Sequence, residues 1–313
     1  MNIGKKQWLI FLGIAGVCVA VIPWLSWLTA YSYGPGLPRS VVISHRGNGF
    51  GHPENTVEAV KAAASNGFKS EIDVHLTKDE KIVVFHDFTV NSGDCKGKIS
   101  ELQSADLTLC DIPLFDLFSN YTNRRLVGLV VHVKGHSQSL INKVLGQLGP
   151  GDSVFIDSVN SPKAYIKSVH EASLTNPAVQ IIYNVQSEED VEMIEPYIRL
   201  GDCIGLSTRH MWRESSLFTK AFKVSHGMVG SHGGGYGVND RMMVEGIPLV
   251  FYETDFPNEV VTGSVARPPP EIPYILFAFP ILVTSFVFGT FFACLTEEKI
   301  SEKTFKAANS LVF

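Results

Sequence analysis

The chain has 313 residues and a formal net charge of −5, and 18% of its residues are charged while 45% are hydrophobic. This length is sufficient for one large domain or two small ones. Proteins that bind nucleic acids usually present a basic surface, so the slightly negative charge argues against that class.

The first predicted element is an uncharged segment at residues 8–28, which follows Lys5 and Lys6. It is long enough to cross the hydrocarbon core of a bilayer as a helix, which takes about 20 apolar residues. A cleaved signal peptide is the alternative, although the apolar stretch exceeds the roughly 7–15 residues typical of such peptides. We interpret residues 1–31 as a cytoplasmic N-terminus followed by a transmembrane helix.

Strand-like and helix-like runs alternate through the middle of the chain. This alternation predicts βαβ units and a parallel sheet, so the fold class is α/β. About eight strands in this length suit a closed (β/α)8 TIM-type barrel at residues 40–262, with an open doubly wound sheet as the alternative. Strands are predicted at 41–44, 70–76, 81–86, 129–133, 154–156, 179–185, 203–206, 228–231 and 249–252, and helices at 55–67, 137–148, 162–172, 188–200 and 215–224.

A second uncharged segment, residues 273–295, follows a Pro-rich linker at 263–272. It is also long enough to be a transmembrane helix, and lysines follow it in the tail at 296–313. Positive residues flank membrane spans on the cytoplasmic side, so we expect both termini in the cytoplasm. The barrel is then expected to be lumenal, periplasmic or extracellular, in an integral membrane protein with two spans.

Three cysteines lie within the predicted barrel region: Cys95, Cys110 and Cys203. An oxidising compartment would permit a disulfide between Cys95 and Cys110 and leave Cys203 free. Three buried thiols are the alternative interpretation.

Polar residues gather where three of the predicted strands end. His45 and Arg46 follow the first strand, Glu71 and Asp73 lie on the second, and His86 ends the next. The carboxyl ends of barrel strands meet at one face, where active sites are built. We therefore expect these residues to lie together.

The residue types in these clusters suit phosphoryl chemistry. Glu71 and Asp73 are two apart on a strand, so both side chains point to one face, where a hard divalent cation such as Ca²⁺ or Mg²⁺ would neutralise their repulsion. Two histidines, His45 and His86, could divide acid and base work, and Arg46 offers a planar fork suited to phosphate. Solvated acids and structural histidines are the alternative.

Taken together, these segments resemble the glycerophosphodiester phosphodiesterase family. The resemblance rests on His45-Arg46-Gly47, Pro53-Glu54-Asn55-Thr56, Glu71-Ile72-Asp73-Val74 and His86-Asp87, and weaker similarity continues at 112–116 and 254–257. It implies a (β/α)8 barrel, a divalent metal, and cleavage of glycerophosphodiesters to glycerol 3-phosphate and an alcohol. The residues it assigns are the metal ligands Glu71 and Asp73, the acid–base pair His45 and His86, and the substrate-binding residues Arg46, Glu54 and Lys134.

The third barrel strand departs from the family's pattern. The family has Glu-x-Lys there, with the glutamate completing the metal site, whereas this chain has His132-Val133-Lys134. We expect His132 among the metal ligands, but imidazole carries no negative charge and favours Zn²⁺ or another transition ion such as Mn²⁺. His232, near the end of the barrel, is a further residue that could line the site.

The expected function is therefore metal-dependent hydrolysis of glycerophosphodiesters or lysophospholipids by histidine acid–base catalysis. The products would be glycerol 3-phosphate or lysophosphatidate, and an alcohol. A tether to the lipid bilayer favours lipid-derived substrates. Two alternatives remain: a sphingomyelinase-D-like phospholipase on the same barrel, and a catalytically weak barrel that serves as a membrane-tethered binding protein.

Overall fold

Eight parallel strands form a closed ring in the computed structural model, which describes residues 37–92, 95–119, 127–207, 215–234 and 249–262. Each strand pairs with the next along the chain, and the last strand pairs with the first, which closes the barrel. This confirms the barrel and excludes the open sheet. The strands are β1 (Val42–Ser44), β2 (Lys69–Leu76), β6 (Leu129–Val133), β7 (Ser153–Asp157), β8 (Gln180–Val185), β9 (Cys203–Ser207), β10 (Val229–Gly234) and β11 (Tyr252–Thr254).

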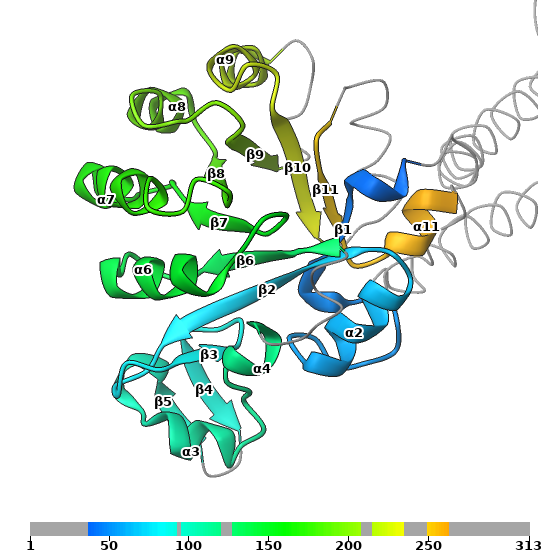
Figure 1. Ribbon diagram of the computed structural model, residues 1–313, viewed down its shortest axis with the longest axis vertical. Helices are drawn as coiled ribbons and strands as arrows, with labels where there is room; N and C mark the ends of the chain where they lie inside the picture. The colour runs from blue at the N-terminus through cyan, green and yellow to red at the C-terminus, as the bar shows by residue number, and fades with distance from the viewer. Residues whose placement is uncertain (1–36, 93–94, 120–126, 208–214, 235–248, 263–313) are drawn as a thin grey trace, which may run out of the picture. The chain divides into compact units, whose positions relative to one another are not determined.

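Helices lie outside the ring of strands, with α6 to α9 forming an outer arc in Figure 1. Several begin at a hydroxyl cap, which satisfies a free backbone N–H of the first turn: Thr56 before α2, Ser137 before α6, Ser187 before α8 and Ser215 before α9. The helices are α2 (Val57–Ser65), α6 (Gln138–Gln147), α7 (Lys163–Ser173), α8 (Glu188–Ile194), α9 (Ser216–Val224) and α11 (Pro257–Thr262), and a 3-10 turn, η1 (Arg39–Val41), precedes β1.

The α8 helix is shorter than the sequence pattern suggests. It ends at Ile194, whereas the apolar spacing predicts a helix as far as residue 200. Pro196 follows closely and has no backbone N–H to donate to the preceding turn.

The barrel has two hydrophobic cores. The larger core packs between strands and helices, and the smaller one fills the barrel interior with residues that include Ile43, Phe155 and Phe251. Gly230 makes room inside, because a β-carbon at that position would overlap the Phe251 ring. The interior is therefore filled by side chains, and polar chemistry is confined to the barrel's end.

β3 (Ile82–Val84) is not a barrel strand, so the prediction that His86 ends one of the converging strands is wrong. β3 pairs antiparallel with β2. The link between them, residues 77–81, is far shorter than the dozen or so residues that a parallel crossover requires. β3 therefore runs back along β2, and the backbone N–H of Phe85 donates to the carbonyl oxygen of Asp73 at 3.0 Å. His86 reaches the level of the site by this return.

The chain between β3 and β6 forms a small satellite with its own apolar core around Val90, Ile99 and Leu107. It projects from the barrel beside β2 and β3 in Figure 1. Its elements are β4 (Thr89–Ser92), β5 (Cys95–Lys98), η3 (Ile99–Glu101), α3 (Ser104–Thr108) and α4 (Asp116–Ser119).

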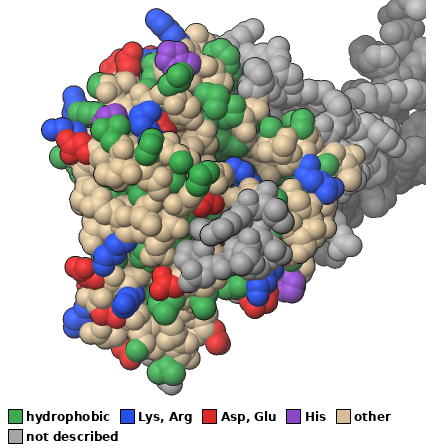
Figure 2. Space-filling view, viewed as in Figure 1, with side chains coloured by type: hydrophobic (Ala, Val, Ile, Leu, Met, Phe, Trp, Pro, Cys, Tyr) green, Lys and Arg blue, Asp and Glu red, His purple; other side chains and the backbone are tan. Residues whose placement is uncertain are grey.

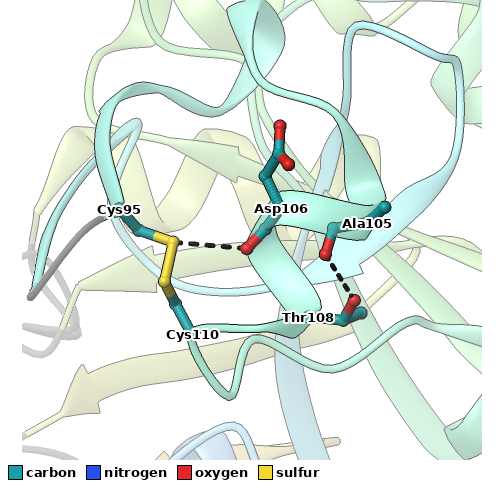
Figure 3. Close-up of a disulfide and its surroundings, with 5 residues drawn as sticks. All are labelled: Cys95, Ala105, Asp106, Thr108 and Cys110. Atoms are coloured by element: carbon teal, nitrogen blue, oxygen red, sulfur yellow. Dashed lines mark hydrogen bonds between the residues drawn. A yellow bond between two sulfur atoms is a disulfide. The ribbon is translucent and has the colours of Figure 1, made fainter.

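A disulfide joins Cys95 on β5 to Cys110 beyond α3, with the two Cα atoms 6.3 Å apart (Figure 3). The Sγ atom of Cys95 also lies 3.3 Å from the carbonyl oxygen of Asp106. The structure therefore confirms the predicted disulfide between Cys95 and Cys110 and excludes the alternative of three buried thiols. Cys203 is a buried free thiol in the barrel interior.

Within the ranges that the structure describes, no helix combines the length and the apolar character that a membrane crossing requires. The predicted spans at 8–28 and 273–295, the linker at 263–272 and the tail at 296–313 lie outside the described residues. They remain predictions.

Loss of the disulfide is expected to lower the free energy of unfolding by about 3 kcal/mol, the value for a closed loop of this size. The bridge spans 15 residues, and without it the unfolded chain gains conformational freedom. Urea denaturation of the wild type with and without reductant measures this change. The double variant Cys95→Ser, Cys110→Ser is the control and should not respond to reductant. Equal stability of the oxidised and reduced wild type would contradict the prediction.

Candidate active site

The first site residues lie in a short 3-10 turn, η2 (His45–Gly47), directly after β1. Arg46 has a φ of 52°, a left-handed conformation that costs energy for a residue with a side chain. Gly47 follows with a φ of 75°, and a β-carbon there would come within 2.8 Å of Ala59 on α2. The turn brings the backbone N–H of Arg46 to 3.0 Å from Oε2 of Glu71, to which it donates.

Asp73 on β2 is surrounded by hydrogen-bond donors and cations. Its Oδ1 atom lies 3.0 Å from Nζ of Lys134 and 3.2 Å from Nδ1 of His132. Asn55 donates to Oδ2 at 3.0 Å and accepts from the backbone N–H of Asp73 at 3.1 Å. Burial alone would raise the pKa of Asp73, but His132, Lys134 and Asn55 together hold it well below its usual range.

Glu71 is just as deeply buried but has far fewer partners. Its side chain is 2% exposed, and its Oε1 atom makes no hydrogen bond, although Nδ1 of His132 lies 3.7 Å away. Burial, together with the charges of Asp73 and Glu253, raises the pKa of Glu71 to about 8. A buried carboxylate oxygen without a partner is costly, and a cation is the partner that would relieve it.

A series of polar side chains in contact extends from His132 along the barrel wall. The Nε2 atom of His132 lies 3.2 Å from Oδ2 of Asp157 on β7. Asn184 on β8 donates to the other oxygen of Asp157 at 2.7 Å, and the Nε2 atom of His232 on β10 lies 2.7 Å from Oδ1 of Asn184. Burial would lower the pKa of His132, but Asp157 and Asp73 raise it to about 9. His232 therefore does line the wall.

His45 is held by carboxylates from the far end of the barrel sequence. Its Nδ1 atom lies 2.8 Å from Oδ1 of Asp255, which also accepts a hydrogen bond from Asn48 at 3.0 Å. Its Nε2 atom lies 3.6 Å from Oε1 of Glu253. Burial would lower the pKa of His45, but the bond to Asp255 and the charges of Glu253 and Glu71 raise it to about 9.

Two of the predicted site residues lie at the exposed rim. Glu54 accepts a hydrogen bond from Nη1 of Arg46 at 3.0 Å. The Nδ1 atom of His86 lies 2.7 Å from Oδ1 of Asp87, and the side chain of His86 is 38% exposed. In the described structure His86 makes no hydrogen bond or ion pair with Glu71 or Asp73.

The three predicted metal ligands converge. One ligand atom from each of Glu71, Asp73 and His132 lies within 4.8 Å of the others, and the same holds for His45, Glu71 and Glu253. Glu71, whose buried Oε1 atom makes no hydrogen bond, belongs to both groups. The residues therefore fit a divalent cation, and carboxylate oxygens suit Ca²⁺, Mg²⁺ or Mn²⁺.

Sequence reasoning missed Glu253, Asp157 and Asn184, and it assigned no role to Asp255. A signal for Glu253 was present, because it and Asp255 are two apart at the end of a strand, the same spacing as that of Glu71 and Asp73. The hydrogen bond from Asn184 to Asp157 joins two separate strands, so no pattern of neighbouring residues in the sequence could have predicted it.

The fold and the site define a (β/α)8-barrel protein with an acidic, histidine-containing cluster at the carboxyl ends of its strands. Residues 45–185 match the model of the glycerophosphoryl diester phosphodiesterase family. The crystal structure of a glycerophosphodiester phosphodiesterase from Agrobacterium tumefaciens covers 71% of this chain and 99% of its own, with a TM-score of 0.55 and 16% identity, which shows the shared fold.

Curated relatives agree with this match. A glycerophosphodiester phosphodiesterase of Caldanaerobacter subterraneus is 27% identical over 170 residues, which is 52% of this chain and 66% of that protein. A lysophospholipase D of Rattus norvegicus is 36% identical over 72 residues, which is 23% of this chain and 22% of that protein. The chain thus spans less than two thirds of either relative's length. Over residues 45–185 the chain is therefore similar to the glycerophosphoryl diester phosphodiesterase family, whose members are hydrolases acting on phosphodiester bonds.

Asp255→Asn is expected to lower the pKa of His45 and to remove roughly 1.5–3 kcal/mol of unfolding free energy at low pH, the contribution of a hydrogen bond to a charged group. The folded pKa of about 9 exceeds the ordinary value of 6.5. The stabilisation from the contact between Asp255 and His45 is therefore fully present below the ordinary pKa of histidine. It is lost as the pH rises through the pKa of His45 in the folded protein. Urea denaturation in a chelating buffer, at about pH 6 and about pH 10, measures the difference.

Asp87→Asn is the matched control, because it removes the carboxylate from the exposed pair with His86. Exposed pairs contribute at most about 1 kcal/mol. A loss in Asp255→Asn that stays the same at both pH values would contradict the prediction.

Proposed function

We propose that this protein hydrolyses glycerophosphodiesters, and lysophospholipids that carry the same glycerol phosphodiester group, with a divalent cation held at Glu71 and Asp73. The observation that carries the proposal is the buried Oε1 atom of Glu71, which makes no hydrogen bond, beside an Asp73 carboxylate that contacts the cations Arg46 and Lys134. The match to a phosphodiesterase family model supports the reaction class. The names of the relatives support both substrate types.

Phosphate binding is the proposed role of Arg46 and Lys134. The Nε atom of Arg46 is buried and makes no hydrogen bond, and Lys134 lies 3.0 Å from Asp73 with its side chain 10% exposed. A planar guanidinium and an ammonium on one side of a buried site suit the oxygens of a phosphodiester. Glu54 orients Arg46 from the rim. When bound, the divalent cation would polarise a phosphoryl oxygen and stabilise the charge that develops on it.

Proton transfer is the proposed role of His45 and His86. Asp255 holds Nδ1 of His45, so that Nε2 is directed towards Glu253 and Glu71. A neighbouring divalent cation would lower the pKa of His45 by charge repulsion, so that the ring can exchange a proton near neutral pH. One histidine would take the proton of the attacking oxygen, and the other would protonate the departing alkoxide.

Each of the variants His45→Ala and His86→Ala is expected to lower kcat by roughly 10²–10⁴-fold, the usual contribution of a general acid or base. The measurement is choline release from glycerophosphocholine and from lysophosphatidylcholine by the full chain, with Ca²⁺, Mg²⁺, Mn²⁺ and Zn²⁺ tested in turn. His226→Asn is the control, because His226 is exposed in the loop before β10, and asparagine tolerates its φ of 52°.

Absence of turnover with every metal and both substrates would refute the phosphodiesterase proposal and leave a binding role. Full activity in both His45→Ala and His86→Ala would refute the acid–base assignment. Sphingomyelin as a third substrate in the same assay tests the sphingomyelinase-D-like alternative.

A membrane-anchored protein with the barrel outside the cytoplasm is the proposed topology. The uncharged segments at 8–28 and 273–295 support it, as does the disulfide, because disulfides persist mainly in oxidising compartments. In sealed vesicles whose outer face is cytoplasmic, the barrel is expected to resist added protease until detergent is present. Digestion before detergent would contradict this topology.

A further inference from the structure

The third barrel strand, β6, brings His132 to the site, a residue that carries no negative charge to neutralise a cation. The structure contains another buried carboxylate in the same cluster, Glu253 on β11, which is 8% exposed. A ligand oxygen of Glu253 lies within 4.8 Å of ligand atoms of Glu71 and His45. Glu253 comes from the opposite end of the barrel sequence.

Both ring nitrogens of His132 already contact carboxylates. Its Nδ1 atom lies 3.2 Å from Oδ1 of Asp73, and its Nε2 atom lies 3.2 Å from Oδ2 of Asp157. Imidazole ligates a metal through a nitrogen lone pair, and both ring nitrogens of His132 are directed at carboxylate oxygens. Lys134 and Asn55 also contact Asp73. The two carboxylates that flank His132, those of Asp73 and Asp157, therefore already have partners.

The carboxylates nearer β11 have fewer and longer contacts. Glu71 Oε1 is buried without a hydrogen bond and lies 3.7 Å from Nδ1 of His132. Among the described residues the side chain of Glu253 makes no hydrogen bond, and its ion-pair partner is Nε2 of His45 at 3.6 Å. Two neighbouring buried carboxylates repel each other, and a hard divalent cation between them would relieve the repulsion and gain oxygen ligands.

The closure of the barrel makes this pairing possible. β1 lies between β11 and β2, and Glu253 is in register with Ile43 on β1. Side chains from the first two strands and the last strand therefore meet across a single strand. A carboxylate on β11 can reach the same cation as one on β2.

We propose that Glu253 is a ligand of the divalent cation together with Glu71, so that β11 supplies the carboxylate that β6 lacks. This assignment rests on the proposed function, because it takes the cation as part of a phosphodiesterase site. His132 then serves as a positioning residue, which joins Asp73 to Asp157 and holds the β6 side of the site together.

The test is the Mn²⁺ affinity of the full chain, measured from the electron paramagnetic resonance signal of free Mn²⁺. Glu253→Gln is expected to raise the Kd at least tenfold, because even residues behind the ligands change metal affinity by about 10–100-fold. Glu259→Gln is the matched control, since it removes the same charge from α11, where the side chain of Glu259 has no described contact with the site. An unchanged Kd in Glu253→Gln would overturn the proposal.

Thermal unfolding separates a ligand from a structural residue. Saturating Mn²⁺ should raise the thermal midpoint of the wild type and raise that of the Glu253→Gln variant much less, since a ligand stabilises only the state that binds it. Each protein is compared with its own metal-free form, because the variant also loses the ion pair with His45. An equal Mn²⁺-dependent rise in both proteins would overturn the proposal.

His132→Ala provides the competing comparison. A ligand role for Glu253 predicts a smaller rise in Kd for His132→Ala than for Glu253→Gln. A larger rise in Kd for His132→Ala than for Glu253→Gln would identify His132 as the ligand and overturn the proposal. The proposed phosphodiesterase function would be unaffected by that result. Conversely, a wild type that binds Mn²⁺ through Glu253 but releases no choline would sustain this assignment and refute the proposed function.

Discussion

The site depends on two carboxylates, Glu71 and Asp73, that the alternation of β2 places side by side at the buried mouth of the barrel. Their repulsion must be balanced, and the surrounding structure does so unequally. Asp73 contacts Lys134, His132 and Asn55 at 3.0–3.2 Å, whereas the Oε1 atom of Glu71 makes no hydrogen bond and lies 3.7 Å from Nδ1 of His132. The difference separates a cationic side of the site from an anionic side.

This separation gives each side its own chemical role. The cationic side, with Arg46 and Lys134, can hold the phosphate oxygens of a substrate. The anionic side, with Glu71 and Glu253, can hold a metal ion, and His45 lies beside it with its other ring nitrogen fixed by Asp255. The face drawn in Figure 2 shows acidic and basic side chains interspersed among the described residues.

The satellite between β3 and β6 contributes through its first turn. Because β3 is antiparallel, the chain returns to the level of Asp73 before it enters the satellite, and His86 lies at that point. The disulfide between Cys95 and Cys110 closes the satellite a few residues later. A small, cross-linked element therefore follows directly after a proposed catalytic residue, next to the rim of the barrel.

The sequence by itself determined the barrel, and it predicted that Glu71 and Asp73 share one face, because strand alternation and the spacing of these two residues are local properties of the chain. It also predicted that His132 would join them, and the three side chains do converge. Only the tertiary structure decided that β3 runs antiparallel and that Glu253 and Asp255 meet His45. Those contacts join residues more than 200 positions apart through the closure of β11 on β1. Local patterns carry no information about which distant side chains a closed barrel will bring together.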